Sequence, residues 1–221
     1  MSKLLSIFGS RRTWAWPYVL FMLCFVILPL ILIAFYAFTD AAGAFTIQNF
    51  VGFFSKSEAV NTFIYSIAIA LITTIICILI GYPAAYIMAM QSFRTPQVMA
   101  ILFILPMWIN FLLRTIATVE LFHMFGLPLG EGALIFGLVY DFLPFMIYPI
   151  YNTLQKLDTN LIEAAQDLGA NQRKVFTKII IPLSMPGVYS GIIMVFMPTV
   201  STFAISELLT HNKITLFGSL I

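Results

Sequence analysis

Residues 163–169 read Glu-Ala-Ala-Gln-Asp-Leu-Gly, and residues 179–182 read Ile-Ile-Ile-Pro. This stretch decides the fold because it places a charged segment between two long apolar runs of the chain. Its pattern is Glu-Ala-Ala, three residues, Gly, nine residues, and then Ile, any residue, Ile and Pro. A chain with so few charged residues has few other places at which it can meet soluble proteins.

The composition identifies the class of protein. Hydrophobic residues make up 61% of the chain and charged residues 9%, with a mean hydropathy of +1.01. A soluble domain carries roughly 25% charged residues, so this chain is an integral membrane protein. The net charge of +2 gives no basic surface for nucleic acid. Cys24 and Cys77 lie inside apolar runs without Cys-x-x-Cys spacing, which predicts neither a disulfide nor a metal site.

Long apolar runs predict the number of spans. A bilayer core about 30 Å thick needs roughly 20 apolar helical residues. Runs of this length lie near 17–38, 62–90, 97–118, 133–153 and 184–206. The sequence therefore predicts an all-α integral membrane bundle with five complete spans, in one transmembrane domain over 1–221. Residues 214–221 resemble the beginning of a sixth span, so either the last span is missing or the protein departs from a six-span pattern.

The distribution of basic residues predicts the orientation. Successive loops lie on alternating sides of the membrane, and most basic residues lie in loops on the same side as the N-terminus: Lys3, Arg11, Arg12, Arg94, Lys156, Arg173, Lys174 and Lys178. Lys56 and Lys213 lie on the other side. Because loops rich in Lys and Arg stay in the cytoplasm, the N-terminus and the 154–182 segment are predicted to be cytoplasmic.

The 154–182 segment predicts a short helix followed by a turn. Asp158, Thr159 and Asn160 are candidate N-caps, and Asn160 with Glu163 approximates a capping box. Gly169 suits the position that ends the helix. One narrow apolar face is predicted on this helix, formed by Leu161, Ala164, Ala165 and Leu168.

A second helix is predicted after the turn, with Asn171 as its cap and Pro182 as the residue that stops it within the next turn. Its apolar face comprises Val175, Phe176 and Ile179, and its basic face comprises Arg173, Lys174 and Lys178. The two helices are predicted to lie on the membrane surface. Physics alone favours an amphipathic connector that merely links two spans, with its basic residues near anionic lipid, because such connectors are common.

The Glu-Ala-Ala pattern resembles the EAA loop of the inner-membrane permease subunits of bacterial ATP-binding-cassette (ABC) importers. Every spacing agrees, and Ile181 stands where the family has Leu. The resemblance implies a type I ABC importer permease fold, and a coupling helix that docks on an ATPase subunit. By this resemblance, the residues that correspond to the docking motif are Glu163, Ala164, Ala165 and Gly169. We call 154–182 the coupling loop.

Further segments are similar to the permease subunits of spermidine/putrescine importers, in particular the first of the two: 81–86, 105–114, 137–140, 143–146 and 157–158. The resemblance implies a bacterial cytoplasmic membrane location and transport by alternating access. It implies as partners a second homologous permease subunit, two ATPase subunits and an extracytoplasmic polyamine-binding protein, within membrane lipid.

Other functions stay open at this point. The same features occur in permeases for iron(III), thiamine or sulfate, and a passive channel or membrane scaffold is a further alternative. The chain has no phosphate-binding loop, no His-Glu-x-x-His and no Gly-x-Ser-x-Gly motif. We therefore expect no catalysis and no cofactor in this chain, with ATP and Mg²⁺ used by a partner ATPase.

Asp141 is the first candidate for contact with a polycationic substrate, because an acid well inside a span is costly and by default faces a cavity or a partner. The alternative is an ion pair with Arg114 on the preceding span. Trp108, Tyr140 and Tyr148 offer ring faces for cations, although packing is the commoner role of each such ring, because aromatic rings bury large apolar area anywhere. Glu120 and Glu207 lie near the outer ends of their spans and complete the predicted path.

Overall fold

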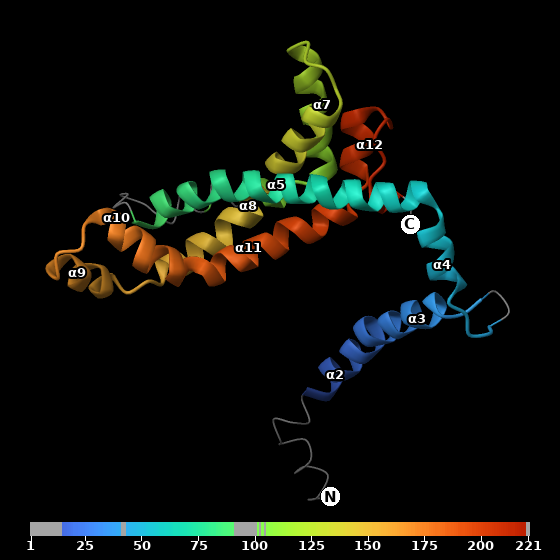
Figure 1. Ribbon diagram of the computed structural model, residues 1–221, viewed down its shortest axis with the longest axis horizontal. Helices are drawn as coiled ribbons and strands as arrows, with labels where there is room; N and C mark the ends of the chain where they lie inside the picture. The colour runs from blue at the N-terminus through green and yellow to red at the C-terminus, as the bar shows by residue number, and fades with distance from the viewer. Residues whose placement is uncertain (1–14, 41–42, 91–100, 102, 104, 220–221) are drawn as a thin grey trace, which may run out of the picture. The chain divides into compact units, whose positions relative to one another are not determined.

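The computed structural model describes residues 15–40, 43–90, 101, 103 and 105–219 (Figure 1). Its described elements are helical, apart from an isolated bridge between Thr39 and Phe45. By their contacts, residues 1–60 and 61–221 form two compact units. The all-α membrane fold predicted from composition is confirmed.

The first unit carries one helical run, Trp16–Ala37. It comprises α2 (Trp16–Met22), the π-helical turn η2 (Leu23–Ile27) and α3 (Leu28–Ala37). A short helix, α4 (Gln48–Ser55), follows, and the side-chain amide of its Asn49 donates to the carbonyl oxygens of Tyr36, Ala37 and Thr39. The run is 22 residues long, enough for one span, and it agrees with the prediction of 17–38.

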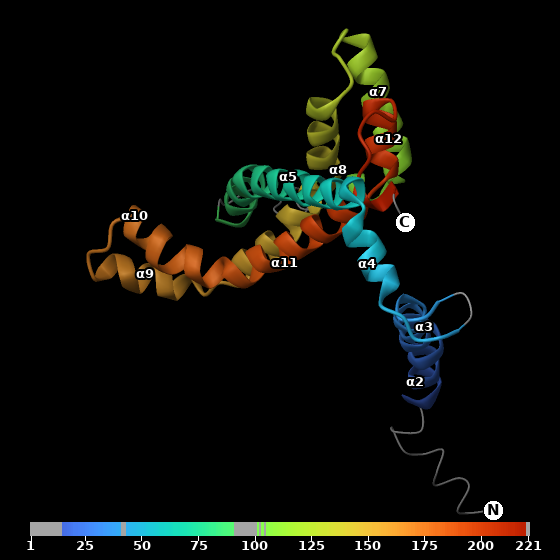
Figure 2. The ribbon, with the colours of Figure 1, turned by 45° about the vertical axis from the view of Figure 1, so that its right-hand side comes forward.

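The second unit is built on three long helices. These are α5 (Ser57–Met90), which begins just before the unit boundary, α8 (Glu131–Gln155) and the continuous helical run Gln172–Ser201. That run consists of α10 (Gln172–Val175), the π-helical turn η4 (Phe176–Ile180) and α11 (Ile181–Ser201). Figures 1 and 2 show α11 beside the later part of α8, whereas the start of α8 lies next to α7 and α12.

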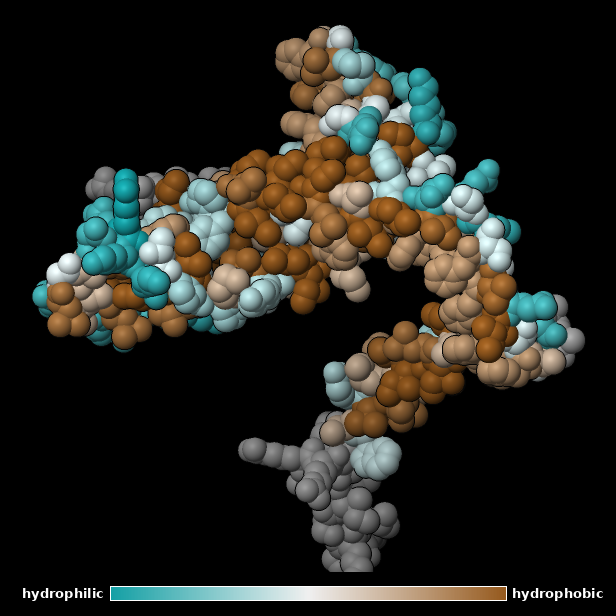
Figure 3. Space-filling model, in the orientation of Figure 1, coloured by the Kyte–Doolittle hydropathy of each residue, from teal (hydrophilic) through white to brown (hydrophobic). Residues whose placement is uncertain are grey.

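Shorter helices complete the two ends of this unit. At one end lie the 3₁₀ turn η3 (Leu105–Trp108), α7 (Phe111–Met124), α12 (Ala204–Thr210) and the 3₁₀ turn η5 (Phe217–Ser219). At the other end lies α9 (Thr159–Asp167), next to α10. Figure 3 shows hydrophobic surface along α5 and α11, with hydrophilic residues gathered where α9 and α10 lie. This is the surface expected of a bundle whose middle lies in lipid.

Two clusters of buried side chains hold the second unit together. One joins α8 to α5, α10 and α11, and includes Met146, Ile150 and Val188. The other joins α8 to α7 and α12, and includes Leu134, Leu138 and Leu209. Helix α8 therefore belongs to both clusters, one toward each end of the unit.

Two of the predicted spans differ from the structure. Residues 97–100, 102 and 104 of the third lie outside the described residues, and its described part is broken at Ile109 between η3 and α7. The break follows from Pro106 in η3 and from Asn110, whose side chain accepts from the amide of Leu112 and starts a new helix. Four helices, not five, are long and apolar enough to span a membrane among the described residues.

The fifth predicted span, 184–206, has different ends. Its helix ends at Ser201, and Thr202 takes an extended conformation before α12 begins. Its N-terminal limit was also wrong, because the helix continues through Pro182 from the coupling loop. We attribute this continuity to the wider π-helical turn η4, which ends two residues before the proline and relaxes the clash that proline makes with the preceding turn. The second loop helix therefore does not lie separately on the membrane surface.

Candidate functional site

The coupling loop is shaped by local backbone bonds. Asp158 caps α9, and its side chain accepts from the amide of Asn160 at 3.0 Å. Asp158 was one of three predicted caps, whereas the predicted cap at Asn160 is not the one that forms. Because Asn160 lies inside the helix, it cannot serve as the first residue of a capping box.

The end of α9 follows the prediction for Gly169. Its φ is +82°, in the left-handed region that favours glycine. The amide of Gly169 donates to the carbonyl of Gln166, and the amide of Ala170 donates to that of Ala165, both at 2.9 Å. This pair of bonds is a Schellman motif. The next helix begins as predicted, with Asn171 accepting from the amide of Lys174 at 2.9 Å.

Helix α9 turns one side toward the protein and the other toward solvent. Ile162 and Ala165 are half-buried and pack against the cluster that includes Val175. Leu161 and Leu168 are exposed, with Leu168 89% exposed. The predicted apolar face is thus divided, since Ala165 faces inward while Leu161, Ala164 and Leu168 remain open. Glu163 is exposed and lines a small cavity next to Tyr86 of α5.

The second predicted helix face is largely confirmed. Val175 is buried, and Phe176 packs edge-to-face against Tyr82 and Tyr86 of α5, with ring centroids 6.2 and 5.2 Å away. The three basic residues of the opposite face, Arg173, Lys174 and Lys178, are exposed. The start of this helix is therefore held against α5 by its apolar side.

A second site lies at the other end of the unit. A cavity of about 650 Å³ opens where α11 ends, between η3, α7, α8 and α12. We call it the Asp141 cavity. Most of its wall is apolar or aromatic, including Trp108, Phe111, Phe142, Phe145 and Phe203. Among the described lining residues, Arg114 and Asp141 carry the charges.

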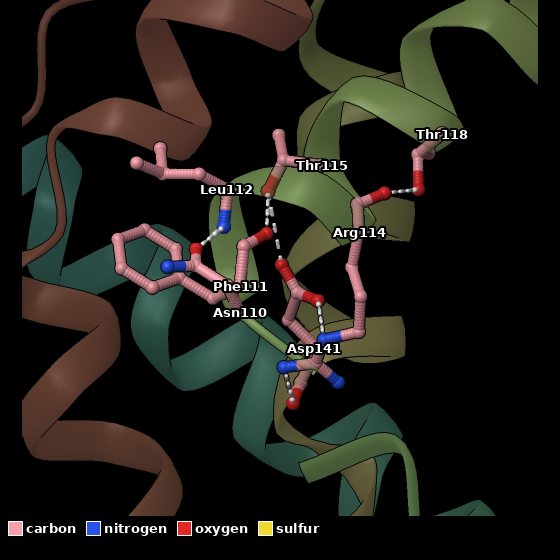
Figure 4. Close-up of polar contacts among 7 residues, drawn as sticks. All are labelled: Asn110, Phe111, Leu112, Arg114, Thr115, Thr118 and Asp141. Carbon is pink, nitrogen blue, oxygen red and sulfur yellow. Dashed lines mark hydrogen bonds and ion pairs between the residues drawn. The ribbon is translucent and has the colours of Figure 1, made fainter. Parts of the chain in front are cut away.

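The charged wall is a buried ion pair between α7 and α8. Arg114 Nε lies 3.2 Å from Asp141 Oδ1, and the side chains are 6% and 2% exposed. Figure 4 shows the carboxylate between the Arg114 guanidinium and the hydroxyl of Thr115, whose Oγ1 lies 3.2 Å from Asp141 Oδ2. The ion pair proposed as the alternative role of Asp141 is therefore present.

The contacts of this pair are incomplete. Arg114 Nε, Arg114 Nη1 and Asp141 Oδ1 are buried without a hydrogen-bond partner in the described part of the chain, so the 3.2 Å contact is an ion pair without hydrogen-bond geometry. A bidentate pair would join two guanidinium nitrogens to both carboxylate oxygens. The guanidinium instead reaches the main-chain oxygen of Asp141 with Nη2 at 3.5 Å, and its carbon lies 5.8 Å from the centre of the Tyr140 ring. A buried charge pair with unsatisfied atoms is poorly compensated for its loss of water.

The predicted path residues are not all brought together. Trp108 and Asp141 line the cavity, and Tyr140 lies beside it through Arg114. Tyr148, Glu120 and Glu207 are exposed and do not line it. Thr115 and the end of α11 were not predicted from the sequence. Pro198 lies inside α11, and no residue at the break itself, at Thr202, marks it in the sequence.

Residues 78–220 match the family described as binding-protein-dependent transport system inner membrane component. That match includes the coupling loop and the residues that line the Asp141 cavity. The chain belongs to this family.

Individual relatives agree with the family. The spermidine/putrescine transport system permease protein PotB of Haemophilus influenzae is 34% identical, over 90% of this chain and 78% of that protein. The Escherichia coli PotB is also 34% identical, over 90% of this chain and 81% of its own length. A PotB homolog of Mycoplasma genitalium is 29% identical, over 89% of this chain and 73% of that protein. The chain is accordingly a multi-pass inner membrane component of a transport system.

Proposed function

We propose that the chain is a permease subunit of an ATP-driven ABC importer, and that it forms the translocation path for spermidine or putrescine by alternating access. The observation that carries the proposal is the 34% identity to PotB permeases over 90% of the chain. Its partners are a second homologous permease subunit, two ATPase subunits and an extracytoplasmic polyamine-binding protein. The N-terminus and the coupling loop are assigned to the cytoplasm.

The exposed side of α9 supports docking of an ATPase subunit. An apolar helix face placed in a groove is a common recognition mode. Leu161 in α9 and Leu168 at its end are apolar but exposed, and no described residue of this chain covers them. Ala164 between them is small enough for close approach. The Schellman turn at Gly169 fixes where this face ends. Docking there leaves ATP and Mg²⁺ to the partner, and this chain needs no cofactor.

The continuous helical run Gln172–Ser201 supports the coupling of ATP hydrolysis to transport. It begins in the coupling loop and ends at the wall of the Asp141 cavity. Along it, α11 packs on α8, which carries Asp141. A rigid helix that joins two sites can carry a movement from one to the other. Docking at the loop therefore has a direct mechanical route to the cavity.

The test is ATP-driven uptake of labelled spermidine into vesicles that hold the complete assembly. We expect uptake that requires ATP and that putrescine inhibits. Inhibition by thiamine or ferric ion, without inhibition by putrescine, would assign a different cargo. Flux without ATP would point to a passive channel instead.

A pair of variants tests the docking face in the same vesicles. Leu168→Glu places a charge on the exposed apolar face, and we expect uptake to fall at least tenfold, because burying an unpaired charge in a groove costs more than about 1.4 kcal/mol. Leu168→Met keeps an apolar side chain of similar volume and should retain uptake. Recovery of the ATPase with the purified permease should follow the same order. Equal uptake by both variants would contradict docking at this face.

A further inference from the structure

The end of helix α11 gives the Asp141 cavity a second feature that favours cations. The last four carbonyl groups of a helix lack partners within it, and the helix dipole places partial negative charge there. Pro198 and Ser201, in the last turn of α11, line the cavity, and Thr202 then leaves the helix. The carbonyl oxygen of Pro198 accepts from the Ser201 hydroxyl at 3.3 Å, and those of Ser201 and Thr202 pack against Gly218. The contribution of α11 to the cavity is therefore the partial negative charge of its C-terminal end rather than a set of open carbonyl ligands. The carboxylate of Asp141 lines the same space.

Positive groups at this cavity are largely accounted for. The N-terminus of α7 also borders it through Asn110, whose side chain already accepts from the amide of Leu112 at 2.8 Å. Arg114 is the cation of the described wall, and its Nε faces Asp141. A cation that enters the cavity can therefore reach the Asp141 carboxylate only by replacing Arg114.

Both partners of Asp141 have another partner within reach. Thr115 Oγ1 lies 2.9 Å from the carbonyl oxygen of Phe111, closer than to the carboxylate. The Arg114 guanidinium touches the carboxylate through one nitrogen only, and it also lies near the main-chain oxygen of Asp141 and the ring of Tyr140. After releasing the carboxylate, Thr115 would keep its bond to Phe111, and Arg114 would keep its Nη2 contact and the ring of Tyr140. These contacts offset part of the penalty for breaking a buried pair.

We propose that the Asp141 cavity binds an organic ammonium group, which takes the place of Arg114 at the Asp141 carboxylate. An ammonium is a compact charge with its donors at one end, and it fits a single carboxylate near the negative end of a helix dipole. Trp108, Phe111 and Phe203 line the cavity, and their rings would contact the methylene chain or the charge of such a ligand with little directional precision. The inference rests on the proposed polyamine transport, to which it adds a binding site and its charge exchange.

The experiment uses the complete assembly in lipid nanodiscs without ATP. Equilibrium dialysis measures binding of labelled n-butylammonium and labelled n-butanol, which share a chain and differ in charge. Asp141→Asn should weaken n-butylammonium binding by about 30-fold or more, as expected for loss of one partner of a desolvated charge pair. Binding of n-butanol should not change.

Variants of Arg114 separate this site from a purely structural pair. Arg114→Gln removes the internal competitor, so n-butylammonium should bind several-fold more tightly than to the wild type. Arg114→Lys keeps a positive charge on the side chain at this position, so this variant should bind n-butylammonium no more tightly than the wild type does. A structural pair also predicts weaker binding in Asp141→Asn, but it differs at Arg114→Gln, where it predicts weaker rather than tighter binding, and it predicts recovery when the two changes are combined. That recovery would overturn the proposal, as would equal binding by Asp141→Asn and the wild type.

Thermal unfolding of each assembly identifies variants that fail to fold. If Asp141→Asn does not assemble, the difference between Arg114→Gln and Arg114→Lys decides the question, and equal binding by these two overturns the proposal. Uptake separates the site from the cargo. If the assembly bound n-butylammonium in an Asp141-dependent way but imported no polyamine, the proposal of polyamine transport would be wrong and the ammonium site would stand. If the assembly imported polyamine and Asp141→Asn left n-butylammonium binding unchanged, the ammonium site would be wrong and the proposal of polyamine transport would stand.

Discussion

The coupling loop and the Asp141 cavity lie at the two ends of one helical run, Gln172–Ser201, and they are held in place in different ways. The loop is shaped by bonds between residues close in sequence, such as those of Asp158 and Gly169. The cavity is shaped by contacts across the fold, such as that between Arg114 and Asp141. The loop can therefore keep its form while the bundle moves, whereas the cavity must change whenever α7, α8 and α11 shift.

The largest effect is expected where both ends depend on the same packing, at Gly187 in α11. A Cβ atom there would lie 2.6 Å from Thr153 Oγ1 and 2.7 Å from the carbonyl oxygen of Pro149, in α8. Gly187→Ala should force α8 and α11 apart and destabilise the assembly by about 1–3 kcal/mol. Thermal unfolding of the purified assembly measures this, and uptake should fall with it.

Gly132 provides the matched control. It lies in α8 as well, and a Cβ atom there meets nothing within 4 Å. Gly132→Ala should leave the assembly unchanged or make it more stable by up to about 1 kcal/mol, because alanine favours the helix. Equal melting temperatures for the two alanine variants would show that α8 and α11 do not need this close approach.

A smaller effect, confined to the loop, is expected at Gly169. Gly169→Val puts a β-branched residue at a φ of +82°, at a cost of about 1–2 kcal/mol. The Schellman turn should open and displace α9, so that ATP-driven uptake falls while binding of n-butylammonium without ATP stays at the wild-type value. Gly169→Asn is the control, since asparagine tolerates this conformation. If Gly169→Val also lost n-butylammonium binding, the two ends could not be treated as independently built.

The same contrast explains what the sequence could predict. Gly169 and Asn171 were identified because glycine at a helix end and asparagine at a helix start act on their own neighbours. Asp141 and Arg114 were recognised as costly in a span, but their distance of 3.2 Å depends on how α7 lies against α8. The break at Thr202 and the continuity through Pro182 were missed, because both depend on packing and on a π-helical turn rather than on residue type.

The smallest effect tests whether the loop is as locally determined as its bonds indicate. Asp158 caps α9, whereas Asn160 lies within the first turn and has no capping role. Asp158→Ala should destabilise α9 by about 1 kcal/mol, because it removes the acceptor for an otherwise unpaired amide. Hydrogen exchange of the α9 amides in the assembly should accelerate severalfold, with the amides of α8 unchanged. Asn160→Ala should leave exchange in α9 the same or slower, because alanine is the better helix former. Faster exchange in Asn160→Ala than in Asp158→Ala would assign the cap to Asn160 and contradict the locally built loop described for this end of the helix.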